Sequence, residues 1–298
     1  MAMKSPGVTR LPDVWMPRSA AEAWSLKRNF GSDAEYVAGG TLLRTWWEGD
    51  IAERPAHLID IRSLPGLSGI RSTENGGTVI GAGTSLTSVR RSGWLASRYP
   101  ALTEAAFRIG ALSIRNAGTI GGNAASGIGD LLPALLVYEA GLLWYDGQEE
   151  LIPAEKWLEH PETYRTPEKL LVHVRLPSHP KSGAGAFSAF RKVGRREAFT
   201  PSVVTAALSA EISEEGRLGC VRIAAGGGST VPQRLYAAEA LMEGRRVEPE
   251  LLAEVHGAVE KTFRPKGDAF AGEAYRKRTA ANLIAAEWWK LARGQGEE

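Results

Sequence analysis

The spacing of apolar residues separates a first part with alternating helices and short strands from a second part in which strands precede helices. In the first part, apolar side chains recur at helical spacing over residues 20–30 and 99–109. Ser19 precedes the first of these helices and Glu22 follows three residues later, the pattern of a capping box. A further helix is expected from about Thr41. Short apolar runs predict strands at residues 35–38, 57–61, 67–73, 78–82, 142–145 and 170–176.

The pattern changes near residue 183, after a segment rich in Gly, Ser and Pro (178–188) that is typical of a linker. Three strands are predicted beyond it, at 186–193, 202–212 and 218–226, and three helices at 235–243, 250–263 and 273–292. A run of strands followed by helices indicates a separate α+β domain. We therefore predict an α+β protein with a first domain over residues 1–182 and a smaller C-terminal domain, a three-stranded sheet with helices, over 183–298.

Two glycine clusters interrupt the first domain. Gly39 and Gly40 follow a predicted strand, and Gly118, Gly121 and Gly122 lie in what reads as a long glycine-rich loop over residues 113–130. Glycine lets a backbone approach a ligand closely, and the N–H groups of such turns bind anions, most of all where a helix begins. The hydroxyls of Thr41, Thr119 and Ser126 offer further donors. A diphosphate shared by the two clusters is one interpretation, and plain tight turns are the other.

Composition narrows the classes of function. The 43% hydrophobic and 23% charged residues are typical of a globular chain, and a net charge of +2 without a basic tract argues against nucleic acid as a partner. No apolar stretch reaches the ~20 residues of a membrane helix, and the N-terminus has no secretory pattern, so a cytoplasmic protein is expected. The one cysteine, Cys220, is expected to be buried in a strand, and one thiol cannot ligate an iron–sulfur cluster. The five histidines lack metal-ligand spacing, so no metal site is predicted.

The glycine clusters carry a resemblance to a known family. Ala38 to Leu43 read AGGTLL, and Ile114 to Asn123 read IRNAGTIGGN. Both resemble motifs of the FAD-binding medium subunits, or matching central domains, of the molybdenum hydroxylases, the xanthine dehydrogenase and carbon monoxide dehydrogenase group. The similarity continues through GDLLPALL, FRKVGRRE and IAAGGGSTVPQR. It implies a two-lobed FAD-binding domain of the PCMH/VAO-like type, with lobes of about 1–60 and 61–182.

The resemblance also implies which residues contact FAD. One lobe would hold the diphosphate with Tyr36, Val37, Ala38, Gly39, Gly40, Thr41, Leu42 and Leu43, and the other with Gly118, Thr119, Ile120, Gly121, Gly122 and Asn123. Ile109 would lie against the isoalloxazine, Asp130 would bind the adenosine ribose, and Leu170 would line the flavin pocket. Lys192 or Arg191 would lie near the pyrimidine end of the flavin, where a positive charge favours the anionic reduced form.

Function follows from the resemblance as an expectation. The chain would carry FAD and no catalytic residue of its own, and it would pass electrons from iron–sulfur clusters to NAD or another acceptor such as oxygen or a quinone. Its partners would be a molybdopterin-binding large subunit and an iron–sulfur small subunit. Two alternatives stay open. One is a free-standing FAD-dependent reductase of related fold, with Ser202 or Glu239 as proton donor, and the other is a flavin-free scaffold subunit.

Overall fold

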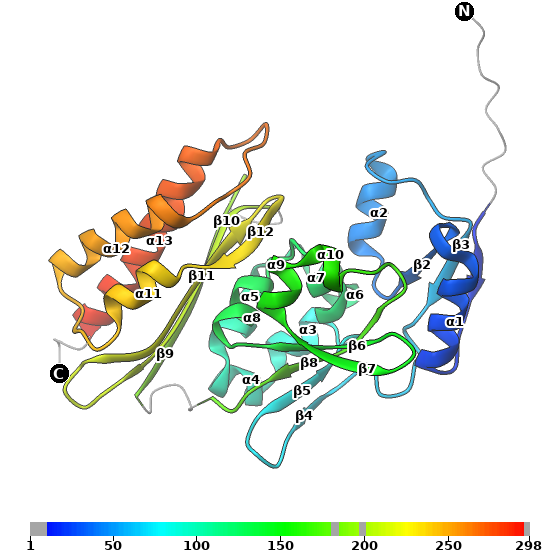
Figure 1. The fold of residues 1–298 in the computed structure, drawn as a ribbon, viewed down its shortest axis with the longest axis horizontal. Coiled ribbons are helices and arrows are strands. Elements are labelled where there is room, and N and C mark those ends of the chain that lie inside the picture. Colours follow the sequence, from blue (N-terminus) through cyan, green and yellow to red (C-terminus); the bar gives the residue numbers. More distant parts are fainter. Residues whose placement is uncertain (1–10, 180–184, 197–200, 295–298) are drawn as a thin grey trace, which may run out of the picture.

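The computed structural model describes residues 11–179, 185–196 and 201–294, and within them three β-sheets follow one another along the molecule. Figure 1 shows the N-terminal sheet at one end, a central sheet with its helices, and the C-terminal sheet at the other end. The predicted boundary between residues 182 and 183 lies outside the described residues. That boundary and the division into lobes at residue 60 stay predictions.

The N-terminal sheet is small and parallel. Its strands are β1 (Asp13–Trp15), β2 (Ala34–Val37) and β3 (His57–Asp60), in the order β1-β3-β2. Helix α1 (Ala20–Phe30) packs on it and starts as predicted, because the Ser19 hydroxyl accepts a hydrogen bond from Glu22 N. The second half of the capping box is different, since the Glu22 carboxylate accepts from Arg18 N and not from Ser19 N. After β2 the chain leaves the sheet and turns into helix α2 (Thr41–Glu48).

The central sheet is antiparallel, in the order β4-β5-β8-β6-β7. Its strands are β4 (Ile70–Ser72), β5 (Thr78–Gly81), β6 (Gly141–Tyr145), β7 (Glu149–Pro153) and β8 (Leu170–Leu176). The connections contain short helices: α3 (Leu86–Arg91), α4 (Gly93–Arg98), α5 (Pro100–Arg108), α6 (Leu112–Ala117), α7 (Ile120–Ala125), α8 (Leu132–Val137), α9 (Ala154–Glu159) and α10 (Pro161–Tyr164).

Residues 113–130 are not the continuous loop that their composition predicts. Helix α6 and helix α7 occupy most of the segment, and α7 begins at a Thr119 side chain that accepts from Gly122 N. Each helix has six residues, too short to show a helical period, so the tertiary contacts described below stabilise them.

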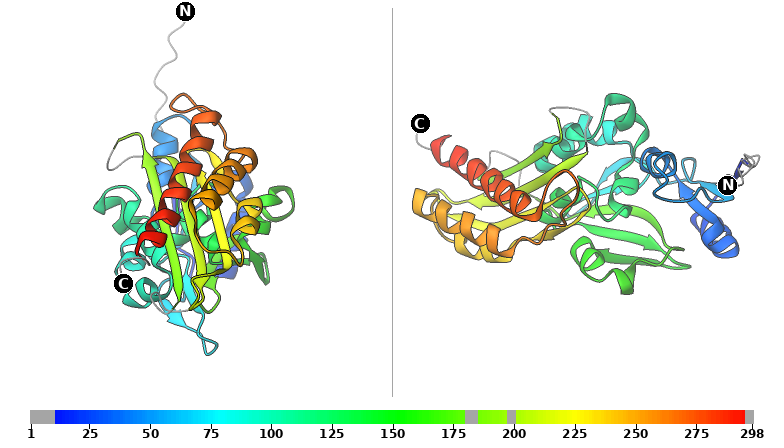
Figure 2. Two further views of the ribbon diagram at one scale, coloured as in Figure 1. Left: turned by 90° about the vertical axis from the view of Figure 1, so that its left-hand side faces the viewer. Right: turned by 90° about the horizontal axis from the view of Figure 1, so that it is seen from above.

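The C-terminal sheet has four antiparallel strands, in the order β12-β11-β10-β9, and not the three that were predicted. Strands β9 (Ala186–Gly194), β10 (Ser202–Ile212) and β11 (Leu218–Gly227) match the prediction, and β12 (Thr230–Arg234) is added. Helices α11 (Tyr236–Met242), α12 (Pro249–Thr262) and α13 (Glu273–Gly294) lie on the outer face of the sheet (Figure 2). The α+β class is confirmed.

Cys220 lies in β11, as predicted, but the prediction that it is buried is wrong. The residue is exposed and has a φ of 50°, because β10 and β11 lose register near this position and the backbone twists into the left-handed region. Its N–H donates to the Glu243 carboxylate, which fixes this irregular conformation.

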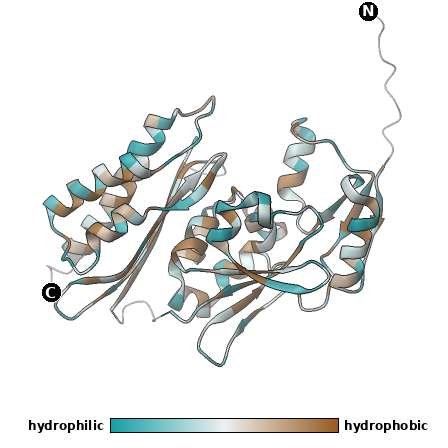
Figure 3. Ribbon diagram, viewed as in Figure 1, coloured by the Kyte–Doolittle hydropathy of each residue, from teal (hydrophilic) through white to brown (hydrophobic). Residues whose placement is uncertain are grey.

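The C-terminal sheet separates two hydrophobic cores. Phe190, Ala207 and Ala224 point toward the central domain and join its core, where α5 and α8 cover this face. Their neighbours along the strands, such as Leu208 and Ile223, point toward α11–α13 and form the second core. Helix α8 consists of buried apolar residues and proline, and its segment is brown between the two sheets in Figure 3. None of the described helices is long and apolar enough to span a membrane.

Candidate functional site

The first glycine turn leaves several backbone donors free at the start of α2. Gly40 is the N-cap residue, with a φ of 64°, and no side chain caps the helix. Within the described residues, the N–H groups of Gly40, Thr41 and Leu42 have no hydrogen-bond acceptor. Free N–H groups and the positive end of a helix dipole favour an anion at this position.

The second glycine turn uses its N–H groups differently from the expectation. Those of Ile120 and Gly121 donate to Thr84 O (2.9 Å) and Ala82 O (2.8 Å), and those of Gly122 and Asn123 donate to the Thr119 hydroxyl and carbonyl. The prediction of free donors is therefore wrong for these four groups. Their hydrogen bonds hold the turn tightly against the end of β5.

Two glycines in these turns allow backbone contacts that a side chain would block. A Cβ on Gly39 would lie 2.1 Å from Ala117 O, and a Cβ on Gly121 would lie 2.5 Å from the Ala82 Cβ. The first contact joins the turn before α2 directly to the end of α6, just ahead of Gly118. The structure thus brings the two glycine clusters together, and Thr41 Oγ1 lies 3.4 Å from where a Cβ of Gly118 would be.

Some hydroxyl groups around the turns are free to bind a ligand, and others form hydrogen bonds within the protein. Within the described residues Thr41 Oγ1 has no hydrogen bond, and Thr119 Oγ1 accepts from Gly122 N while keeping its own proton to donate. The Ser126 hydroxyl donates to Asn123 O (2.7 Å), so it serves the loop rather than a ligand. Asn123 itself accepts from Leu131 N (3.0 Å) and thereby positions the segment that carries Asp130.

Asp130 lies between the two domains. Its carboxylate accepts from Lys192 Nζ (2.7 Å) on β9 and from the Ser202 hydroxyl (2.5 Å) on β10. Side-chain exposures of 13% for Asp130 and 7% for Lys192 make this a largely buried ion pair. Lys192 also donates to Arg108 O (3.1 Å) and Ser202 accepts from Gly228 N (3.1 Å), so the cluster fastens the C-terminal sheet to the helices of the central sheet.

The structure distinguishes the two candidate basic residues. Lys192 follows Phe190 on the strand face that points toward the central domain, and Arg191 points to the opposite face. There Arg191 Nη2 pairs with Glu287 of α13 at 2.7 Å. Lys192 lies beside Asp130, and Arg191 does not.

The remaining predicted residues lie around the turns at different depths. Tyr36 donates its hydroxyl to Glu168 O (2.9 Å), and burial, with the nearby Glu35 charge, raises the pKa of its phenol, which stays neutral. Leu170 is enclosed in the main core two residues beyond Glu168. Ile109 is half-buried at the end of α5, next to the Arg108 carbonyl that Lys192 contacts. Val37, Ala38, Leu42 and Leu43 are half-buried or exposed on β2, the turn and α2.

Two residues near the site were not predicted to belong to it. Ser202 was considered only as a proton donor, because its sequence gives no sign that β10 runs past Asp130. Arg115 is within the second motif, and its buried guanidinium donates to Ile109 O (3.2 Å) and Gly110 O (2.6 Å). The position of Arg115 within the second motif is the sequence feature that could have indicated its role.

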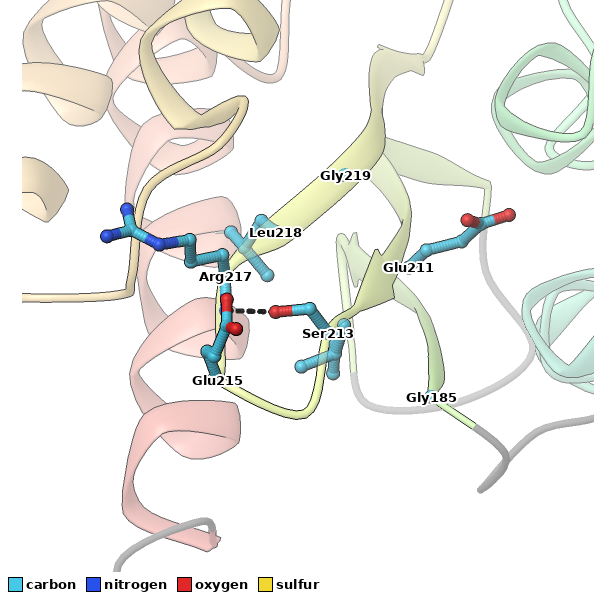
Figure 4. Close-up of a pocket in the computed structure, with 8 residues that line it drawn as sticks. Gly185, Glu211, Ser213, Glu215, Arg217, Leu218 and Gly219 are labelled. Carbon is cyan, nitrogen blue, oxygen red and sulfur yellow. Dashed lines mark hydrogen bonds between the residues drawn. The ribbon is translucent and has the colours of Figure 1, made fainter.

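A hollow of about 440 Å³ lies elsewhere, at the turn between β10 and β11 (Figure 4). Glu211, Ser213, Glu215 and Arg217 line it, and Arg217 N donates to the Ser213 hydroxyl. None of the predicted site residues borders this hollow, so we do not assign it to the site.

The residues at the two turns fit a dinucleotide. Free N–H groups at the start of α2, the unbonded Thr41 hydroxyl and the glycine at position 40 provide donors for a diphosphate. A diphosphate carries the negative charge that these groups favour. FAD is such a dinucleotide, and Lys192 supplies a cation on the side of the C-terminal sheet.

Comparison with known proteins agrees with this geometry. Residues 8–179 match the family model for the FAD binding domain in molybdopterin dehydrogenase, and residues 188–290 match that for the CO dehydrogenase flavoprotein C-terminal domain. The chain is 32% identical to the 6-hydroxypseudooxynicotine dehydrogenase complex subunit alpha of Paenarthrobacter nicotinovorans, over 91% of each protein. It is 30% identical to the carbon monoxide dehydrogenase medium chain of Afipia carboxidovorans, over 91% of this chain and 93% of that one.

A solved structure shows the same fold. The carbon monoxide dehydrogenase of Hydrogenophaga pseudoflava contains a chain that aligns with a TM-score of 0.84 and 29% identity, covering 93% of this chain and 96% of that chain. The family matches extend over both domains of the chain. The chain therefore belongs to the FAD-binding subunits of the molybdopterin dehydrogenase family, a group of oxidoreductase subunits.

Proposed function

We propose that this chain is the electron-transfer subunit of a heteromeric molybdopterin and iron–sulfur hydroxylase. In this proposal FAD receives electrons from iron–sulfur clusters on a small subunit and passes them to NAD or another acceptor, while a large subunit binds molybdopterin. The observation that carries the proposal is the contact of Gly39 with Ala117, which places two glycine turns together beside the free N–H groups of α2.

The need for partners is supported by the cysteine content. An iron–sulfur cluster is normally held by four cysteine thiolates, and the sequence has one cysteine. Similar proteins carry the names medium chain and complex subunit, which imply further chains in those enzymes. We extend this arrangement to the present chain.

We assign each group around the site a role toward FAD. The N–H groups of Gly40, Thr41 and Leu42 would bind the diphosphate together with the Thr41 and Thr119 hydroxyls. Lys192 and Asp130 would lie at the end of the site that faces the C-terminal domain, with Ile109 beside them. Tyr36 would close the other end through its bond to Glu168 O. FAD supplies the redox chemistry when bound, and these residues orient it and set its electrostatic surroundings.

A free-standing reductase is less well supported by the geometry. Its two candidate proton donors are both engaged in structural bonds. Ser202 donates to Asp130, and Glu239 accepts from Ile223 N and pairs with Arg234 at 2.7 Å. The match to an FAD-binding domain disfavours the flavin-free scaffold.

Co-expression with the products of neighbouring genes tests the proposal. We expect the chain to co-purify with an iron–sulfur protein and a molybdopterin protein, and the complex to reduce NAD or a dye with an oxidisable substrate. A chain that remains alone under these conditions and turns over a small substrate by itself would contradict the proposal.

A further inference from the structure

Three arginine side chains surround one exposed phenylalanine beside the site. The guanidinium carbons of Arg90, Arg115 and Arg108 lie 4.2, 5.6 and 5.9 Å from the centre of the Phe107 ring. They come from α3, α6 and α5, and α3 packs against both of the other helices. The phenyl ring is 39% exposed, so a partner can reach it.

The charge of this region is strongly one-sided. Residues 86–117 contain five arginines and one acidic residue, Glu104. Arg108 pairs with Glu104 at 2.7 Å, whereas Arg90, Arg91 and Arg115 have no acidic partner among the described residues. Burial, and then the positive charge of Arg90, lowers the pKa of Arg115, because like charges close together repel each other. Carboxylates from outside would relieve this repulsion.

Apolar side chains border the arginines. Leu112 is 49% exposed and Ile114 is 39% exposed, and with Phe107 they form an apolar strip along the end of α5 and α6. Exposed aromatic and aliphatic residues together with arginine are typical of the centre of a protein–protein interface. A free phosphate or small anion would need the arginines but would leave these apolar side chains uncovered.

Hydrogen bonds hold this surface in place and connect it to the site. Arg115 fixes the turn between α5 and α6 by donating to Ile109 O and Gly110 O, and Gly118 N donates to Ile114 O (2.7 Å). Lys192 reaches Arg108 O from the other side. A protein bound here would lie close to both the second glycine turn and the Asp130–Lys192 pair.

We propose that the surface formed by Arg90, Arg91, Phe107, Leu112 and Ile114 docks an acidic face of the iron–sulfur subunit. The inference rests on the proposed function, because the electron donor has to bind beside the flavin site. A cluster held by four thiolates adds negative charge to such a partner. Complementary charges would orient the two subunits and speed their association.

The test uses the full chain loaded with FAD and the iron–sulfur subunit that co-purifies with it. The dissociation constant is measured at low and at moderate salt for the wild type, for Arg90→Glu with Arg91→Glu, and for Leu112→Asp. All three altered side chains are exposed, so folding should be preserved. Arg246→Glu, an exposed arginine between α11 and α12, is the matched control.

We expect the arginine pair and Leu112→Asp each to weaken binding at least tenfold, with a smaller salt dependence for the arginine pair. Arg246→Glu should change the constant less than twofold, and the FAD content should be the same in all variants. Unchanged binding in the surface variants, or an equal loss in the control, would overturn this inference while leaving the proposed function intact. A wild-type chain that binds neither FAD nor the iron–sulfur subunit would overturn both.

Discussion

Single residues decide how close the two glycine turns come. The sequence motifs predicted that the glycines at positions 39, 40, 118, 121 and 122 belong to the site. The contact of Gly39 with Ala117 explains why position 39 requires a glycine. The sequence could not show whether Arg191 or Lys192 lies beside the site, because this depends on which face of β9 points toward the first domain. The role of Ser202 could not be predicted either, since its contact with Asp130 joins residues that are 72 positions apart in the sequence.

Gly39→Ala should abolish FAD binding. The new Cβ would lie 2.1 Å from Ala117 O, so the backbones of the two turns must separate. Gly93→Ala is the control, since nothing lies within 4 Å of a Cβ at that position. The flavin content of purified protein and a titration with FAD measure the effect. Full flavin content in Gly39→Ala would show that the contact between the turns is dispensable.

Lys192→Met and Arg191→Met should separate the two roles of neighbouring residues. Lys192→Met removes the cation beside Asp130, and we expect FAD to bind at least tenfold more weakly, a loss of about 1.4 kcal/mol or more. Arg191→Met leaves Glu287 with Lys290 as a partner, so we expect lower stability of the fold and FAD affinity within twofold of the wild type. Fluorescence titration with FAD measures both. The opposite order of effects would exchange the two assignments.

At the scale of elements, long periodic segments were predictable and short ones were not. Strands β8 and β10 and helix α1 have the predicted bounds, because apolar spacing over their lengths reflects burial. Helices α6 and α7 and strand β12 escaped prediction. A glycine-rich sequence favours turns, and these elements are stabilised by tertiary contacts such as those of Gly121 with Ala82 and of β12 with β11.

The segment before α13 contains a carboxylate, Asp268, that should make the stability of the fold depend on pH. Backbone hydrogen bonds, chiefly from Phe270 N, and the Arg276 guanidinium at 2.5 Å lower the pKa of Asp268. A lowered folded-state pKa adds stability above the unfolded value near ~4, and this stability is lost as the pH falls through the folded value. Arg276 also bonds Val203 O and Ala271 O, so the loss reaches β10.

Asp268→Asn should therefore be less stable than the wild type at pH 7, and the difference should be smaller at pH 3. Urea unfolding at the two pH values measures the difference in free energy. Glu250→Gln, an exposed residue in the first turn of α12, is the control for loss of one carboxylate. A gap between Asp268→Asn and wild type that does not shrink at pH 3 would contradict the linkage.

At the scale of the whole molecule, the C-terminal sheet links two cores. Phe190 is fully buried and extends from β9 into the core of the first domain, where α5 and α8 cover it. The sequence of β9 and β10 does not show that one face of the sheet joins the first core. Nearly every position of β10 is buried on one face or the other, so no polar face marks the solvent side. Position within the layers is a property of the assembled fold.

Phe190→Ala should lower the free energy of unfolding by about 3–5 kcal/mol, the usual range for a buried phenylalanine. Val231→Ala, at an exposed position of β12 in the same sheet, should change it by less than about 0.5 kcal/mol. Urea unfolding followed by tryptophan fluorescence measures both. A small effect at Phe190 would show that the two domains do not share a core.

The measurement that tests the central claim most directly is a titration of the purified, flavin-depleted chain with FAD. The proposal that two glycine turns hold one diphosphate predicts saturable binding of one FAD per chain, a yellow protein, and no binding by Gly39→Ala. A folded wild-type chain that stays colourless and shows no saturable uptake of FAD would contradict the account.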